Sequence, residues 1–119
     1  MIYGIGTDLV EVARVKMAYE RESFRKKIYT EQEQQMIAEN AQRAAGNFAV
    51  KESVVKAFGT GFGKISAIDI EVLRETSGKP YVILHGPAEE QAQREHILQI
   101  HVSISNTKEH AIGYVVMEV

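Results

Sequence analysis

Hydrophobic and polar residues alternate along several short stretches of the chain. The clearest case runs from Leu98 to Ile104, where every second residue is aliphatic and the residues between them are polar. This period of two is typical of a strand with one buried face. Together with other short apolar runs, it predicts strands at residues 1–6, 67–73, 81–85, 98–105 and 111–118.

Two turn sequences join these strands into antiparallel hairpins. S-G-K-P at 77–80 separates the strands at 67–73 and 81–85, and N-T-K-E-H at 106–110 separates the last two strands. Glycine, proline, serine and asparagine favour tight turns, because their backbones or short polar side chains suit turn geometry. The second half of the chain therefore contains two predicted hairpins.

The first half of the chain has the pattern of helices instead. T-E-Q-E-Q-Q at 30–35 begins with a threonine suited to an N-cap and continues with an acidic first turn. Helices are predicted at 9–20, 30–43 and 46–58, and a short polar helix after Pro87. Early helices and late antiparallel strands indicate an α+β fold, with an antiparallel sheet packed against helices.

Composition narrows the possible functions. The 119 residues are 45% hydrophobic and 25% charged, so we expect a single domain over residues 1–119. The absence of cysteine excludes disulfides, thiolate metal sites and cysteine nucleophiles. No apolar stretch is long enough to cross a bilayer and no basic leader precedes one, so we expect a cytoplasmic protein without membrane contact. A net charge of -2 argues against a nucleic-acid partner.

The stretch K-E-S-V-V-K-A-F-G-T-G at 51–61 combines charges with a helical pattern. Lys51 falls within the broad apolar arc of the helix, so it needs either a buried partner or a path to water. Glu52 and Lys56 lie four residues apart on the adjoining face. They form either an ordinary helix pair or part of a functional site.

Two glycine-rich stretches invite comparison with phosphate-binding loops. G-T-G-F-G-K at 59–64 has neither the glycine spacing nor the hydroxyl residue of a P-loop, and G-I-G-T-D at 4–8 lacks the third glycine of a dinucleotide fingerprint. Their backbone N–H groups could still approach a phosphate closely. The alternative is that they form turns and a helix C-cap.

Asp8 follows the first glycine-rich stretch. If the strand continues to residue 8, then its alternate residues share one face, and the carboxylate stands beside an empty groove: Ile2, Gly4, Gly6 and Asp8. The alternative is a capping box, in which Asp8 caps the next helix and Glu11 occupies its third position.

Three stretches together resemble the motifs of the holo-acyl-carrier-protein synthases, the small 4'-phosphopantetheinyl transferases. They are G-I-G-T-D-L-V-E at 4–11, F-A-V-K-E-S-V-V-K-A-F-G-T-G at 48–61 and V-S-I-S-N-T at 102–107. Their order and spacing fit this family over essentially the whole chain. Two residues depart from it: Asn106 replaces a usual histidine and Asn47 replaces a frequent arginine, which affects how coenzyme A phosphates are held.

The resemblance implies a fold, a reaction and a set of site residues. The fold is that of a 4'-phosphopantetheinyl transferase, with each chain equivalent to half of a larger two-fold enzyme and sites completed in a homotrimer. The reaction moves 4'-phosphopantetheine from coenzyme A to a serine of apo-acyl-carrier protein. The residues implied to bind coenzyme A are Lys51, Gly59, Thr60, Gly61, Ser105, Asn106 and Thr107.

The same resemblance assigns the chemistry to three residues. Asp8 and Glu52 would hold Mg²⁺, which prefers one or two carboxylates together with substrate oxygens and water. Lys56 would place its charge on the leaving phosphate. Either Glu52 or a metal-bound water would take the serine proton.

A basic stripe could receive the acidic carrier protein. If residues 14–28 formed one helix, its members would fall on one face: Arg14, Met17, Arg21, Phe24 and Arg25. Positive charge would steer an acidic partner, and the apolar residues would supply affinity. The alternative is a solvated basic surface.

Two other functions fit the same residues. One is a non-enzymatic trimeric sensor that binds coenzyme A or ATP through the glycines. The other is a Mg²⁺-dependent phosphodiesterase acting on small nucleotides. The basic stripe favours a protein acceptor over both.

Overall fold

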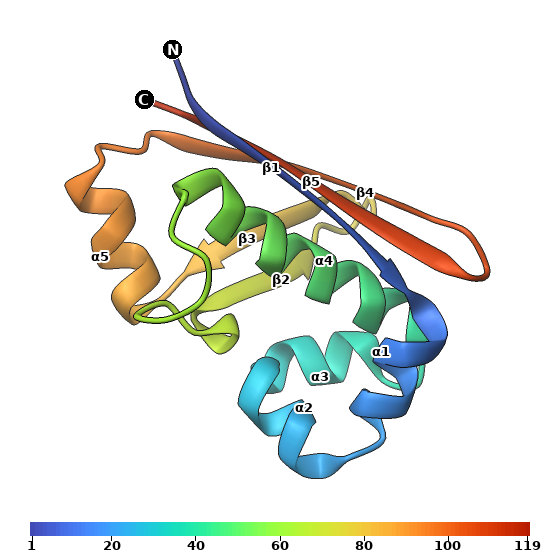
Figure 1. Cartoon of the computed structure of the whole chain (residues 1–119). Helices are drawn as coiled ribbons and strands as arrows, with labels where there is room; N and C mark the ends of the chain where they lie inside the picture. The colour runs from blue at the N-terminus through green and yellow to red at the C-terminus, as the bar shows by residue number, and fades with distance from the viewer.

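The computed structural model describes residues 1–119 and contains helices in both halves of the chain (Figure 1). The elements are, in order, β1 (Ile2–Glu11), α1 (Val12–Tyr19), α2 (Glu22–Ile28), α3 (Glu31–Ile37), α4 (Ala41–Phe58), a 3-10 turn (Ala67–Asp69), β2 (Ile70–Arg74), β3 (Pro80–Leu84), α5 (Gly86–Arg94), β4 (Gln99–Asn106) and β5 (His110–Glu118).

An antiparallel sheet of three strands covers the central helix. The strand order is β1-β5-β4, so the last strand lies in the middle of the sheet and pairs with the first strand on one side. Figure 1 shows α4 running beneath this sheet. The β2–β3 hairpin packs beside β4 and against α4. The predicted α+β class and both predicted hairpins are confirmed.

Two hydrophobic cores hold these layers together. The larger core lies between α4 and the strands, and includes Val54, Val72 and Val115. The smaller core joins α1, α2 and α3 to the first turns of α4, around Tyr29 and Ile37. The helical cluster and α5 therefore occupy opposite ends of the molecule, as Figure 1 shows. No helix is long and apolar enough to cross a membrane.

The first strand is longer than its sequence predicts. It continues to Glu11 because it pairs with β5 along its whole length, ending at Glu11 opposite His110. Asp8 therefore lies inside a strand, opposite Gly113, and α1 begins four residues later. Glu11 occupies the N-cap of α1 and no side chain caps that helix. The expected capping box of Asp8 and Glu11 is wrong.

The helices differ from the prediction at their boundaries. The helix expected at 9–20 is the shorter α1, and a break at Glu20 and Arg21 separates it from α2. The boundary between the helices expected at 30–43 and 46–58 lies at residues 38–40 instead of 44–45. Thr30 and Glu33 form the capping box of α3, which ends where Ala38 takes a φ of 50°, and Asn40 then caps α4.

Candidate active site

Glycines bring the first strand unusually close to α4. A Cβ atom on Gly6 would lie 1.8 Å from the backbone oxygen of Ser53, and one on Gly4 would lie 2.2 Å from that of Ala57. Gly113 of β5 meets the backbone of Ala49 in the same way. Any side chain at these positions would push the sheet away from the helix. The predicted common face is confirmed for Gly4, Gly6 and Asp8, and it lies against α4 instead of beside an empty groove. Ile2 was wrongly included, because the register of β1 shifts between residues 2 and 4 and Ile2 is exposed.

This close contact places Asp8 beside two charged residues of the helix. The Lys56 ammonium donates to Asp8 Oδ1 at 3.1 Å and to the backbone oxygen of Thr7 at 2.9 Å. The Asp8 side chain is 18% exposed and the Lys56 side chain 51% exposed, so the pair opens to solvent on the lysine side. Lys56 thus pairs across to the strand instead of along its own helix.

Glu52 completes the cluster one turn before Lys56. Its partial burial raises the pKa of the Glu52 carboxyl, and the negative charge of nearby Asp8 raises that pKa further. The positive charge of Lys56 acts in the opposite direction and lowers it. Two carboxylates and one ammonium therefore share a small, partly desolvated site where β1 meets α4. Close carboxylates of this kind favour a cation or a proton between them.

The glycine loop that follows α4 forms a C-cap. Gly59 adopts the left-handed conformation, with a φ of 77°, and its N–H donates to Lys56 O at 3.0 Å. The N–H groups of Thr60 and Gly61 both donate to Val55 O. These three N–H groups are therefore already bonded to the helix, as the C-cap alternative predicts. Their role in binding coenzyme A stays a prediction.

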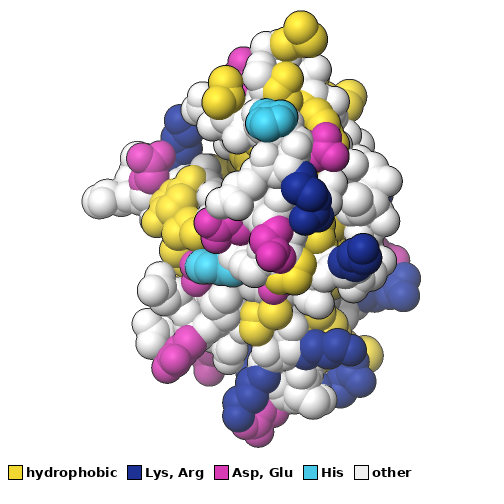
Figure 2. All heavy atoms as spheres, turned by 90° about the vertical axis from the view of Figure 1, so that its left-hand side faces the viewer, with side chains coloured by type: hydrophobic (Ala, Val, Ile, Leu, Met, Phe, Trp, Pro, Cys, Tyr) yellow, Lys and Arg dark blue, Asp and Glu magenta, His cyan; other side chains and the backbone are white.

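A groove of about 880 Å³ lies between this loop and α5. Thr60, Gly61 and Lys64 line one side, and Pro87 and Arg94 line the other. Figure 2, which views the end of the molecule that carries α5, shows basic and acidic side chains close together there. No local pattern marks Lys64 and Arg94 as neighbours, because their position on opposite sides of the groove depends on how α5 packs.

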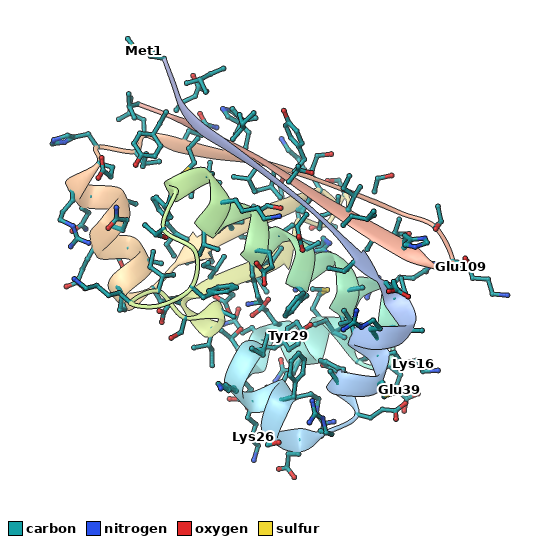
Figure 3. All side chains as sticks on the ribbon, in the orientation of Figure 1. Met1, Lys16, Lys26, Tyr29, Glu39 and Glu109 are labelled. Atoms are coloured by element: carbon teal, nitrogen blue, oxygen red, sulfur yellow. The ribbon has the colours of Figure 1, made fainter.

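Lys51 is fully buried and bonded to the protein. Its ammonium donates to Glu33 Oε1 at 2.8 Å, to Ala67 O at 3.0 Å and to Ile70 O. It also lies 5.4 Å from the centre of the Tyr29 ring, where α2 and α3 meet α4 (Figure 3). Lys51 has the buried partner that its place in the apolar arc requires, so the expectation that it contacts coenzyme A is wrong.

Glu33 is the centre of this buried network. Its Oε1 atom also accepts from the N–H of Thr30 at 3.0 Å, and its Oε2 atom accepts from Asn47 and from the N–H of Val72. Burial lowers the pKa of the Lys51 ammonium, while the Glu33 carboxylate acts to raise it. Glu33 could not be identified from the sequence as the partner of Lys51, because its capping pattern accounts for only one of its two carboxylate oxygens.

The remaining expected binding residues lie far from the glycine loop. Ser105 and Asn106 end β4, and Thr107 follows in the turn to β5. Thr107 O accepts from Gln42, in the first turn of α4, at 2.9 Å. The helix has 18 residues, so its two ends are about 27 Å apart. Figure 3 shows Glu109, in the same turn, at the far end of the molecule from Met1.

The expected basic stripe does not form one continuous helical face. Because the helix is interrupted at Glu20 and Arg21, α1 and α2 have separate axes and their side chains do not line up on one face. The Arg25 side chain points back toward α1 and donates to Tyr19 O at 2.7 Å, which stabilises the junction between α1 and α2. Arg14 and Phe24 still line one groove, of about 540 Å³, beside Leu9. Arg21 and Met17 are exposed.

Known proteins match this architecture along the whole chain. Residues 4–115 match the family model of the 4'-phosphopantetheinyl transferase superfamily. The chain is 56% identical over 119 residues to the holo-[acyl-carrier-protein] synthase of Lachnoclostridium phytofermentans, covering 100% of this chain and 98% of that protein.

Solved structures agree with the sequence relatives. The holo-[acyl-carrier-protein] synthase of Neisseria meningitidis matches with a TM-score of 0.88 at 31% identity, over 100% of both chains. That of Bacillus anthracis matches with a TM-score of 0.83 at 36% identity, over 99% of this chain and 97% of the other. The fold is thus that of the small phosphopantetheinyl-transferring enzymes. This chain belongs to the 4'-phosphopantetheinyl transferase superfamily, and the resemblance seen in its motifs is confirmed.

Proposed function

We propose that this protein transfers 4'-phosphopantetheine from coenzyme A to a serine of an apo-acyl-carrier protein. The observation that carries the proposal is the convergence of Asp8, Glu52 and Lys56 where β1 meets α4. The names of the relatives support the reaction. The Bacillus anthracis protein was solved in complex with CoA (3',5'-ADP), which supports coenzyme A as the donor.

The reaction exchanges the phosphoanhydride bond of the diphosphate for a phosphoester bond to serine. The serine oxygen of the carrier forms a bond to the phosphorus that bears pantetheine, and the bond from that phosphorus to the bridging oxygen of the diphosphate breaks. Adenosine 3',5'-bisphosphate leaves with the electron pair. Lys56 can stabilise the negative charge that develops on it. Glu52 can accept the serine proton, since burial and Asp8 both raise the pKa of its carboxyl.

The donor set also suits Mg²⁺. Asp8 and Glu52 supply two carboxylates, and no cluster of three or more histidine, cysteine or acidic side chains is present to build an all-protein cage. This fits a cation that takes its other ligands from substrate and water. When bound there, Mg²⁺ would neutralise charge on the diphosphate. Lys56 would then exchange part of its contact with Asp8 for the substrate phosphate.

A homotrimer explains why the binding residues are divided between the two ends of α4. The sheet face turned away from α4 exposes aliphatic and aromatic side chains, including Ile5, Leu9 and Tyr114. A patch of this kind is typical of a subunit interface. Packing through it would let Ser105, Asn106 and Thr107 of one subunit serve the Asp8 site of its neighbour.

The carrier protein would dock near α1. The groove beside Leu9 places Arg14, which lies 3.9 Å from Glu11 in an exposed ion pair, beside the apolar surface of Phe24 and Val15. It begins one residue after Asp8, so a partner bound there would present its serine to the site. An acidic helix suits this combination of charge and apolar surface.

Intact-mass analysis tests the proposal. Apo-carrier protein is incubated with this protein, coenzyme A and Mg²⁺, and the released nucleotide is quantified. We expect each carrier to gain one phosphopantetheine, with one adenosine 3',5'-bisphosphate released per transfer. Binding of coenzyme A without turnover would support a sensor, and free phosphopantetheine without modified carrier would support a phosphodiesterase. Either result would overturn the proposal.

A further inference from the structure

His110 lines the groove that we assign to the carrier protein. It begins β5 and lies directly opposite Glu11 of β1 in the sheet. Its N–H donates to Thr107 Oγ1 at 3.1 Å, and its carbonyl oxygen accepts from the N–H of Thr107 at 2.8 Å. The turn thus fixes the backbone of His110 at the edge of the groove, where the residue is exposed.

The same turn is attached to the first turn of α1. The N–H of Val12 donates to Glu109 O at 2.8 Å, so the start of β5 stays beside the helix that carries Arg14. Figure 3 shows Glu109 next to the start of this helix. His110 and Arg14 therefore line one groove from two different elements, β5 and α1.

His110 determines the net charge of the groove. The lining contains three ionisable side chains: Glu11, Arg14 and His110. Arg14 lies 3.9 Å from Glu11, so these two opposite charges largely cancel. The groove is therefore close to neutral while the imidazole is neutral, and positive once the imidazole binds a proton.

The surrounding elements do not cancel a proton on His110. Lys108 and Glu109, in the turn before β5, are both exposed and carry opposite charges. The segments of α2 and α4 that line the groove contribute only phenylalanines. His85 and His101 each have a carboxylate within salt-bridge distance, whereas His110 has none. The charge of a protonated His110 is therefore available to an acidic partner.

We propose that His110 contacts the carrier protein and makes its affinity depend on pH. Docking of the carrier at this groove is part of the proposed function, on which this role of His110 rests. Histidine is the side chain that ordinarily changes its charge near neutral pH, whereas the carboxylates of the partner stay ionised there. An acidic helix would bind the positive groove more tightly than the neutral one, so affinity should fall as pH rises.

Charge variants at residue 110 test this role. His110→Gln keeps a hydrogen-bonding group without charge, and His110→Lys stays positive at neutral pH. His96→Asn is the matched control, because His96 is exposed just after α5, at the opposite end of the molecule, and its φ of 58° suits asparagine. Thermal unfolding confirms that each variant is folded.

Binding and transfer are measured separately. The dissociation constant for fluorescently labelled apo-acyl-carrier protein is measured by anisotropy at about pH 6 and about pH 8, on either side of the ordinary titration of histidine. Coenzyme A and Mg²⁺ are left out, so that ionisation of Glu52 cannot act through the reaction. Transfer is followed in parallel by intact mass.

We expect the wild type and His96→Asn to bind the carrier about two- to fivefold more tightly at the lower pH, the effect of one exposed ion pair. His110→Gln should show the weaker affinity at both pH values and His110→Lys the tighter one, and added salt should reduce these differences. Normal transfer with the same pH dependence of binding in the wild type and His110→Gln would overturn the role of His110 alone. Absence of both carrier binding and transfer would overturn the proposed function and this role together.

Discussion

Replacing Lys51 with methionine should destabilise the fold strongly while leaving coenzyme A affinity nearly unchanged. Methionine has similar length and no charge, so the change removes the ion pair with Glu33 and the bonds to the carbonyls of Ala67 and Ile70. The Glu33 carboxylate would then be buried without its cation. Breaking a buried pair in this way costs about 3–5 kcal/mol of unfolding free energy. The loss is large against a typical total of about 5–15 kcal/mol.

A double-mutant cycle isolates the pairwise contribution. Glu33→Gln removes the charge but keeps one oxygen to accept from the N–H of Thr30 or Val72. Because the double variant contains no uncompensated charge, we expect it to be more stable than the sum of the single losses by about 1–3 kcal/mol. Urea unfolding at a fixed protein concentration measures all four proteins. This matters because self-association would add to the apparent stability.

Two results would refute this reasoning. Additive losses within about 0.5 kcal/mol would show that Lys51 and Glu33 do not stabilise one another. A Lys51→Met protein with unchanged stability and weakened coenzyme A binding would show that Lys51 contacts the substrate, against its complete burial.

Three further predictions concern the active site and its surroundings. By carboxyl NMR, the pKa of Glu52 should lie above the ordinary range of a glutamate, and higher still in Lys56→Met. Its ionisation therefore lowers stability as pH rises through the folded pKa, and a midpoint within or below the ordinary range would contradict this. Gly6→Ala should lower the unfolding free energy by at least about 1–3 kcal/mol, because the added methyl group would clash with α4. Gly63→Ala, which has open space around it, should not lower it, and equal losses in the two variants would contradict the close strand–helix contact. Arg14→Glu should raise KM for the carrier protein and reduce its salt dependence without changing KM for coenzyme A; an unchanged carrier KM would place docking elsewhere.

The hairpins could be predicted because their signals are local. The S-G-K-P turn and the apolar runs beside it lie within a few residues of one another, and β2 and β3 form where expected. The length of β1 could not be predicted, because it depends on pairing with β5, about 100 residues later. The break between α3 and α4 was predicted at 44–45 but lies at 38–40, although Asn40 before Ala41 is an N-cap signal.

The site was predictable in composition but not in arrangement. The motifs brought attention to Asp8, Glu52 and Lys56. The alternation of β1 correctly placed Asp8 on the face of Gly4 and Gly6, but that face lies against α4 and not beside an empty groove. The pairing of Lys56 with Asp8 instead of Glu52 depends on tertiary packing. The need of Lys51 for a partner could be stated from its helical face, but its identity as Glu33 could not, because no local pattern connects the two.

The most direct test of the central claim is the activity of Asp8→Asn in the intact-mass assay at saturating Mg²⁺ and coenzyme A. Asparagine keeps the shape of Asp8 and can still accept a hydrogen bond from Lys56, so the protein should remain folded. It removes one of the two carboxylates that suit a cation beside Glu52. We predict no mass gain on the carrier protein under conditions in which the wild type modifies it completely. Modification by Asp8→Asn at the wild-type rate would contradict the assignment of this site.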